Sequence, residues 1–169
     1  MSQEMIIRKA VPADLQSILR IYEYARNQMR LSGNPDQWKQ NYPPQETIAG
    51  DIADGNSYVI TDGREIAGVF AFIIGEDATY QRIEQGEWLN QDAYGTIHRM
   101  AGNGTRKGLF RLCEQFCESR IGNIRADTHA CNLIMQHLLE THGYQKCGRI
   151  YAADGSPRIA YQKIVHHNS

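Results

Sequence analysis

A turn with three glycines and two adjacent basic residues lies in the segment AGNGTRKGLF (101–110). A strand-like run precedes this segment and a helix-like run follows it. Backbone N–H groups at a helix N-terminus bind phosphate through unpaired donors and the helix dipole, and glycines let the backbone approach the anion. Arg106 and Lys107 add positive charge where phosphates would lie. The segment therefore predicts a phosphate-binding loop.

Two common nucleotide-binding templates do not match this loop. A Walker loop, counted from Gly102, requires glycine where the chain has Lys107. A dinucleotide fingerprint accepts Gly102 and Gly104, but its third glycine again falls on Lys107, and Gly108 comes one residue late. Both nucleotide interpretations are therefore weak.

A histidine precedes the loop in the strand-like run YGTIHRM (94–100). Alternation in a strand would place Tyr94, Thr96, His98 and Met100 on one face. Histidine titrates in the range that general-base catalysis needs, so His98 is the first candidate base. The alternative is a structural histidine hydrogen-bonded within the sheet. Asp127 and His129, which alternate on the next strand, are the reserve candidates.

The elements around these residues alternate between strand and helix patterns. Strands are expected at 5–10, 57–61, 66–74, 94–100 and 123–130, with two more around the turn DGSP (154–157). Helices are expected from Pro12 to Gly33, over 45–55, after the glycine loop, and over 131–143. The run at 66–74 is apolar on both faces and is expected inside the sheet. We predict one α/β domain, residues 3–166, with a mixed, mostly antiparallel sheet and about four helices.

Composition narrows the classes of partner. The chain has 18 Lys and Arg against 19 Asp and Glu, which gives no basic surface for nucleic acid and no polybasic membrane anchor. No signal-like or membrane-spanning apolar segment is present, so a cytoplasmic location is expected. The four cysteines form no CxxC pair, so no metal site is expected.

The loop and its flanks resemble the acyl-CoA-binding region of the GNAT superfamily of N-acetyltransferases. That family has an R/Q-x-x-G-x-G/A turn between its fourth strand and the following helix, and Gly108 takes the place of the first glycine. It also has an asparagine after the fifth strand and a later Gly-aromatic pair, here Asn132 and Gly143-Tyr144. The segments IHR, DTH and RIAYQK resemble a bacterial subgroup, and the similarity covers residues 5 to 165.

The resemblance implies transfer of an acetyl group from acetyl-CoA to an amine acceptor, without a metal. Backbone N–H groups near Met100 would polarise the thioester carbonyl. The residues implied in acetyl-CoA binding are Met100, Ala101, Gly102, Gly104, Thr105, Arg106, Lys107, Gly108, Leu109 and Asn132. Asn132 would contact the pantetheine arm or serve only as a helix N-cap. Family members commonly form dimers, so a homodimer is compatible with the resemblance.

Three positions depart from the family pattern. Thr105 stands where a long polar residue is usual, Phe110 where a small residue is usual, and Leu139 where the general-acid tyrosine is usual. Tyr144 and Tyr151 are candidate substitutes, although nothing in the sequence selects either. These departures leave a second hypothesis open, a catalytically silent CoA-binding sensor or interaction module of the same fold.

The acceptor side is predicted from two irregular segments that contain aromatic residues. The segment at 75–93 carries more acidic than basic residues, and an acidic, aromatic-lined rim suits a cationic amine. Trp38, Tyr80 and Trp88 are the candidate acceptor-binding residues. The alternative is a solvated loop whose aromatic side chains only anchor it to the core.

Overall fold

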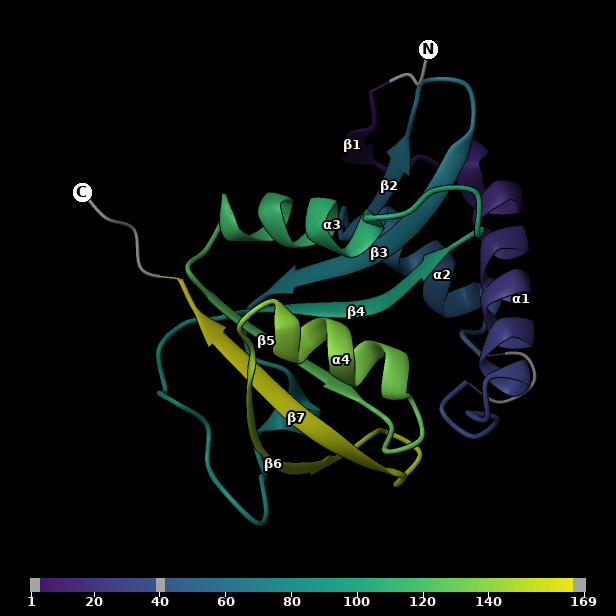
Figure 1. The fold of residues 1–169 in the computed structure, drawn as a ribbon. Coiled ribbons are helices and arrows are strands. Elements are labelled where there is room, and N and C mark those ends of the chain that lie inside the picture. The colour runs from purple at the N-terminus through teal and green to yellow at the C-terminus, as the bar shows by residue number, and fades with distance from the viewer. Residues whose placement is uncertain (1–3, 39–41, 166–169) are drawn as a thin grey trace.

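A seven-stranded mixed sheet in the order β1-β2-β3-β4-β5-β7-β6 runs through the molecule (Figure 1). The computed structural model describes residues 4–38 and 42–165. The strands are β1 (Ile6–Lys9), β2 (Ser57–Thr61), β3 (Ile66–Ile74), β4 (Gly95–Gly102), β5 (Asn123–Thr128), β6 (Gln145–Tyr151) and β7 (Pro157–Ile164). The helices are α1 (Leu15–Leu31), α2 (Gln45–Ala53), α3 (Leu109–Glu118) and α4 (Leu133–Thr141), with short 3₁₀ turns η1 (Pro12–Asp14) and η2 (Ala78–Tyr80).

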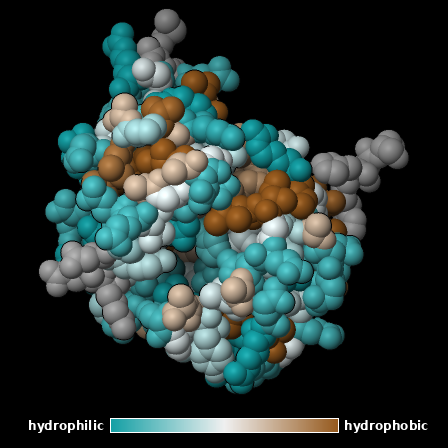
Figure 2. Space-filling view, turned by 180° about the vertical axis from the view of Figure 1, so that it is seen from behind, coloured by the Kyte–Doolittle hydropathy of each residue, from teal (hydrophilic) through white to brown (hydrophobic). Residues whose placement is uncertain are grey.

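Helices cover both faces of the sheet. The apolar stripe of α1 buries Ile18, Ile21 and Tyr22 in a core that it shares with α2 and the N-terminal strands. The apolar stripe of α3 packs with α4 in a second core on the other face, where both helices lie in front of the strands (Figure 1). The view from behind shows scattered hydrophobic patches and a hollow near the centre of that face (Figure 2). The mixed sheet with helices on both faces confirms the predicted fold class, a single α/β domain.

Strands β4 and β5 form the parallel pair of the sheet, and their pairing is short. Only Gly95 with Ile124 and Thr96 with Arg125 are in register, after which the strands diverge (Figure 1). The other neighbouring strands are antiparallel. Because the two strands separate beyond Thr96, they open a wedge between the C-terminal parts of β4 and β5.

A bulge in β4 changes which of its side chains share a face. The register with β3 shifts next to Arg99, whose φ is +51°. Met100 therefore packs in the same core as Ile97, against α3 and α4, and Ala101 packs on the α1 side. The predicted common face for His98 and Met100 is wrong because the bulge resets the alternation of the strand.

Most of the predicted elements are present, and β3 lies inside the sheet as expected between β2 and β4. The fifth strand ends at Thr128, so His129 follows the strand and is not part of it. The domain bounds 3–166 stay a prediction. Among residues 4–38 and 42–165, no helix is long and apolar enough to cross a membrane.

Candidate active site

A cavity of about 520 Å³ occupies the wedge between β4 and β5. The segment between α1 and α2 and the loop between β6 and β7 form its outer walls, and α4 closes one side. Its polar lining includes the side chains of Gln37, Asp77, His98, Asp127 and Arg158. We refer to it below as the acceptor cavity, because Trp38, which the sequence predicts to bind the acceptor, lines it.

His98 is held by a carboxylate that is remote in sequence. Its Nε2 lies 2.7 Å from Oδ2 of Asp77, while Oδ1 of Asp77 accepts hydrogen bonds from the backbone N–H and hydroxyl of Thr79. Burial opposes ionisation of Asp77, but the hydrogen bonds from His98 and Thr79 outweigh it and lower the pKa of this carboxyl to about 2. Asp77 is thus an ionised acceptor that fixes one nitrogen of the imidazole and leaves Nδ1 for other partners.

Asp127 also lines the acceptor cavity, but its carboxylate is engaged. Oδ2 accepts a hydrogen bond of 2.7 Å from the hydroxyl of Tyr80, and Oδ1 lies 3.8 Å from Nη1 of Arg158. His129 lies elsewhere, in a separate cavity beside β6 and the start of β7, where its Nδ1 accepts from the backbone N–H of Cys131. Of the three candidate bases, His98 and Asp127 lie in this cavity and His129 does not.

Side chains of α1 and α2 contact the bulge in β4 and stabilise it. The hydroxyl of Tyr22 donates to the carbonyl oxygen of Arg99 at 2.7 Å. The guanidinium of Arg99 donates to both carboxylate oxygens of Asp51 on α2, at 2.9 and 2.8 Å. A non-glycine residue at positive φ is strained, and these contacts stabilise it. They fix the backbone next to His98 and Met100.

Gln37 links the segment after α1 to the end of β5. Its Oε1 accepts from the side chains of Asn34, Thr128 and Asn132 and from the backbone N–H of His129. Its carbonyl oxygen accepts from Nη2 of Arg158 at 3.0 Å. The wall of the acceptor cavity is therefore joined to the sheet through one side-chain amide.

Asn132 is a helix N-cap, as one of its two interpretations predicted. Its Oδ1 accepts from the backbone N–H of Met135 at 3.0 Å, and its Nδ2 donates to Gln37 at 3.0 Å. The residue also lines the acceptor cavity, so contact with pantetheine stays a prediction.

A second hollow, of about 480 Å³, lies between β4, the N-terminus of α3 and the side of α4. The first backbone N–H groups of a helix have no partner within the helix, so the start of α3 presents donors to this groove. Gly108 caps α3 with φ +77°, a conformation that glycine adopts without strain. Arg106 and Arg111 line the groove, and Arg106 is also paired with Asp62 at 3.1 Å. We call this hollow the α3 groove.

The loop before α3 is braced by its own side chains. Oδ1 of Asn103 accepts from the backbone N–H of Thr105 at 3.0 Å and from its hydroxyl at 2.6 Å. Gly104 has φ +81°, and a Cβ there would collide with the ring of Tyr24 on α1. Thr105 therefore stabilises the turn at the position where the family pattern has a longer polar residue.

The acceptor cavity and the α3 groove meet at three side chains. Met100, Phe110 and Met135 line both hollows. Phe110 is 5% exposed and packs edge-on against the ring of His142, with 4.9 Å between ring centroids. The large side chain at this position therefore forms part of the boundary between the two spaces.

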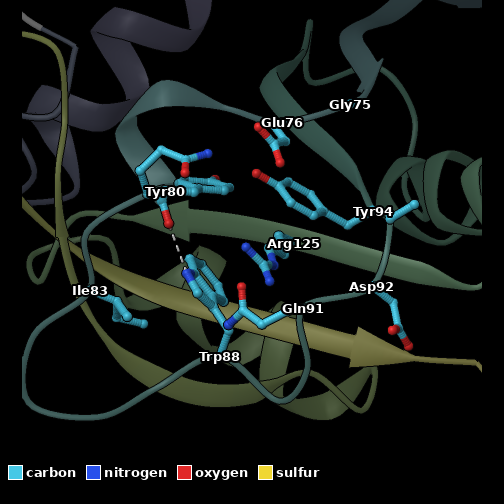
Figure 3. Close-up of a pocket in the computed structure, with 11 residues that line it drawn as sticks. Gly75, Glu76, Tyr80, Ile83, Trp88, Gln91, Asp92, Tyr94 and Arg125 are labelled. Atoms are coloured by element: carbon cyan, nitrogen blue, oxygen red, sulfur yellow. Dashed lines mark hydrogen bonds between the residues drawn. The ribbon is translucent and has the colours of Figure 1, made fainter.

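The predicted acceptor-binding aromatic residues separate into two groups. Trp38 lines the acceptor cavity together with Tyr42, and their ring centroids are 6.3 Å apart. Tyr80 and Trp88 instead line a third cavity, where the indole N–H of Trp88 donates to the carbonyl oxygen of Tyr80 (Figure 3). These two residues therefore lie apart from Trp38, and a part for them in acceptor binding stays a prediction.

Neither tyrosine considered as a substitute acid lines the acceptor cavity or the α3 groove. The hydroxyl of Tyr144 is buried and has no partner among the described residues, and that of Tyr151 donates to Glu84 at 3.0 Å. Leu139 does line the acceptor cavity. No group of three or more potential metal ligands occurs among the described residues.

Sequence reasoning missed four residues of the cavity wall. Gln37 and Arg158 gave no local signal, and Arg99 gave none because the bulge was not foreseen. Asp77 was counted only as one of several loop carboxylates. Its position before a 3₁₀ turn, with Thr79 two residues later, was the available signal for a fixed carboxylate.

Comparison with solved structures found acetyltransferases that match this chain over nearly its full length. A GNAT-family acetyltransferase from Streptococcus agalactiae is 32% identical, covers 98% of this chain and 100% of its own, and superposes with a TM-score of 0.87. An acetyltransferase from Staphylococcus aureus is 26% identical over 95% and 99% of the two chains, with a TM-score of 0.69. A GNAT-family acetyltransferase from Listeria monocytogenes, 20% identical over 98% and 99% with a TM-score of 0.72, shows the fold alone. No protein-family model matches the sequence, and no curated protein matches it.

Proposed function

Because the chain belongs to the GNAT family of acetyltransferases, we propose that it transfers an acetyl group from acetyl-CoA to the nitrogen of an amine acceptor, with His98 as general base. The observation that carries this proposal is the junction of two hollows at Met100, Phe110 and Met135. One hollow begins at a helix N-terminus suited to phosphate, and the other holds the His98–Asp77 pair.

The α3 groove suits the cofactor in charge and in shape. The start of α3, with Arg106 and Arg111 beside it, would bind the pyrophosphate. The apolar residues Leu109 and Leu138 would contact the less polar pantetheine. Acetyl-CoA supplies the thioester carbonyl on which the amine acts. The backbone at the bulge next to Met100 would donate to the oxygen on which negative charge develops.

His98 would remove the proton that the amine must lose. The amine nitrogen forms a bond to the carbonyl carbon, the carbon–sulfur bond breaks, and the sulfur leaves with the electron pair. The proton passes from the amine to His98 and then to the sulfur, directly or through water. Asp77 stabilises the imidazolium in this interval, because its carboxylate lies 2.7 Å from Nε2.

The acceptor cavity favours a compact amine with some positive charge. Trp38 and Tyr42 offer aromatic faces to a cation, and Asp77 and Asp154 add carboxylates to the lining. Arg158 is paired with Asp127 and contacts the carbonyl oxygen of Gln37, so its positive charge is partly neutralised.

The test is a screen with acetyl-CoA and matched pairs of amines and alcohols, in which release of the free thiol is followed. Turnover with amines and not with their alcohol analogues supports the proposal. Turnover with hydroxyl acceptors alone would contradict amine transfer. Binding of acetyl-CoA without turnover across the panel would favour the silent sensor, and no binding at all would remove both hypotheses.

A further inference from the structure

A third cavity, of about 380 Å³, has Tyr80 in its wall (Figure 3), and the hydroxyl of Tyr80 donates to Asp127, which lines the acceptor cavity. The segment between β3 and β4 folds over β5 to form the third cavity. Its walls are the rings of Tyr80, Trp88 and Tyr94, its floor includes the guanidinium of Arg125, and its rim carries the exposed carboxylate of Glu76. The acetyl-transfer proposal gives this cavity no role.

Arg125 has an environment that is uncommon for a buried cation. It is 3% exposed, and its guanidinium carbon lies 4.1 Å from the ring centroid of Trp88 and 3.9 Å from that of Tyr94. Its Nη2 donates to the carbonyl oxygen of Asn90 at 2.8 Å, and its Nε has no partner among the described residues. Within the described part of the chain, no carboxylate lies within ion-pair distance of it.

A buried charge without a counter-charge is costly, and pairing with an anion removes much of that cost. The guanidinium binds carboxylates in a two-pronged geometry, and here it lines a cavity large enough for a small molecule. The rim limits which anion can enter, because Glu76 and Asp92 would repel phosphate and other multiply charged anions. They would attract an ammonium group on the same molecule as the carboxylate.

We propose that this cavity binds a small zwitterionic amino acid, with its carboxylate on Arg125, its ammonium group toward Glu76, and its apolar side chain against Trp88 and Ile83. The site is distinct from the acceptor cavity but connected to it through Tyr80. The ring of Tyr80 is a wall of one cavity, and its hydroxyl donates to Asp127 in the other. Glu76 directly precedes Asp77, which holds His98. This proposal does not depend on the acetyl-transfer reaction.

The chain offers an internal reporter for each cavity. It contains two tryptophans, of which Trp88 lines the third cavity and Trp38 lines the acceptor cavity. In ¹⁵N-labelled protein, titration with L-leucine is expected to move the indole N–H signal of Trp88 and to leave that of Trp38 in place. Isocaproate lacks the amino group of leucine and isoamylamine lacks its carboxylate, and both are expected to bind more weakly.

Two variants complete the test. Arg125→Gln is expected to weaken L-leucine binding about tenfold or more, as loss of a charged hydrogen bond does. Glu76→Gln, at an exposed position that does not threaten folding, is expected to weaken L-leucine and to leave isocaproate unchanged or tighter. Movement of the Trp38 signal alone would show that leucine enters the acceptor cavity and would overturn the proposal. Absence of movement in both signals up to the solubility limit would also overturn it, as would unchanged affinity in both variants.

Discussion

Nε2 of His98 and Oδ2 of Asp77 lie 2.7 Å apart, although the two residues are 21 positions apart in the chain. The contact joins the interior of β4 to the start of the 3₁₀ turn that follows β3. Asp77 is itself fixed, because its other oxygen accepts from Thr79 and its backbone N–H donates to the hydroxyl of Tyr94 at 2.8 Å. A fixed carboxylate of this kind orients the imidazole that we propose as general base.

Asp77→Asn is therefore expected to lower kcat by about 10- to 100-fold, because the variant no longer stabilises the imidazolium. KM is expected to rise much less. Steady-state kinetics with a responsive amine measure the effect. Glu76→Gln, which changes the neighbouring exposed carboxylate, serves as the control and is expected to leave kcat within a factor of about two. Equal losses of kcat in both variants would show that the effect comes from removing a negative charge and not from the contact with His98.

The pKa of Asp77 predicts how stability depends on pH. The folded state lowers this pKa to about 2, so ionisation favours folding. The contribution is fully present above the unfolded pKa near 4 and is lost as the pH falls through about 2. Urea unfolding of wild type and Asp77→Asn should differ by about 1–2 kcal/mol at pH 6, with a difference that shrinks at acid pH. A difference that is the same at both pH values would contradict the ionised assignment.

Gly108→Ala is expected to destabilise the protein by about 1–2 kcal/mol and to weaken acetyl-CoA binding. A Cβ at this position meets no atom within 4 Å, so the effect comes from the left-handed backbone and its consequence for the start of α3. Gly33→Ala is the matched control, since Gly33 also has positive φ and open space but lies after α1. Calorimetric titration should show weaker binding in the first variant only. Equal affinities would place the pyrophosphate elsewhere.

Phe110→Leu is expected to raise kcat/KM for butyryl-CoA relative to acetyl-CoA, because the variant removes part of the boundary between the two hollows. It should also cost about 1–2 kcal/mol of stability. Phe116→Leu changes the same residue type on the same helix without lining either hollow, and its acyl preference should match that of wild type. If both variants showed the same preference, Phe110 would not set the acyl length.

The fold was predictable because its signals are local. Residues close in sequence are enough to recognise three of these signals. They are the apolar stripe of α1, the segment of β3 that is apolar on both faces, and the glycine after α4. The start of α3 at Leu109 also follows from the glycine loop before it. The order of elements then led to the fold class, since it matches a known arrangement.

The acceptor cavity was less predictable because its walls depend on contacts across the chain. Gln37 meets Asn132 over 95 positions, and Tyr22 meets Arg99 over 77. The bulge at Arg99 depends on α1 and α2 rather than on the sequence of β4, so alternation misplaced Met100. Tyr80 and Trp88 were assigned to the acceptor by residue type and by the acidic charge of their segment. Their neighbours, above all Arg125, place them in another cavity.

The role of His98 as general base is best measured by comparing His98→Gln with wild type, in acetyl-CoA binding and in amine-dependent thiol release over a range of pH. We expect unchanged affinity for acetyl-CoA, a kcat that falls about 100-fold or more, and a pH–rate profile that loses the limb belonging to the base. An unchanged kcat with the same pH–rate profile would show that His98 is not the base.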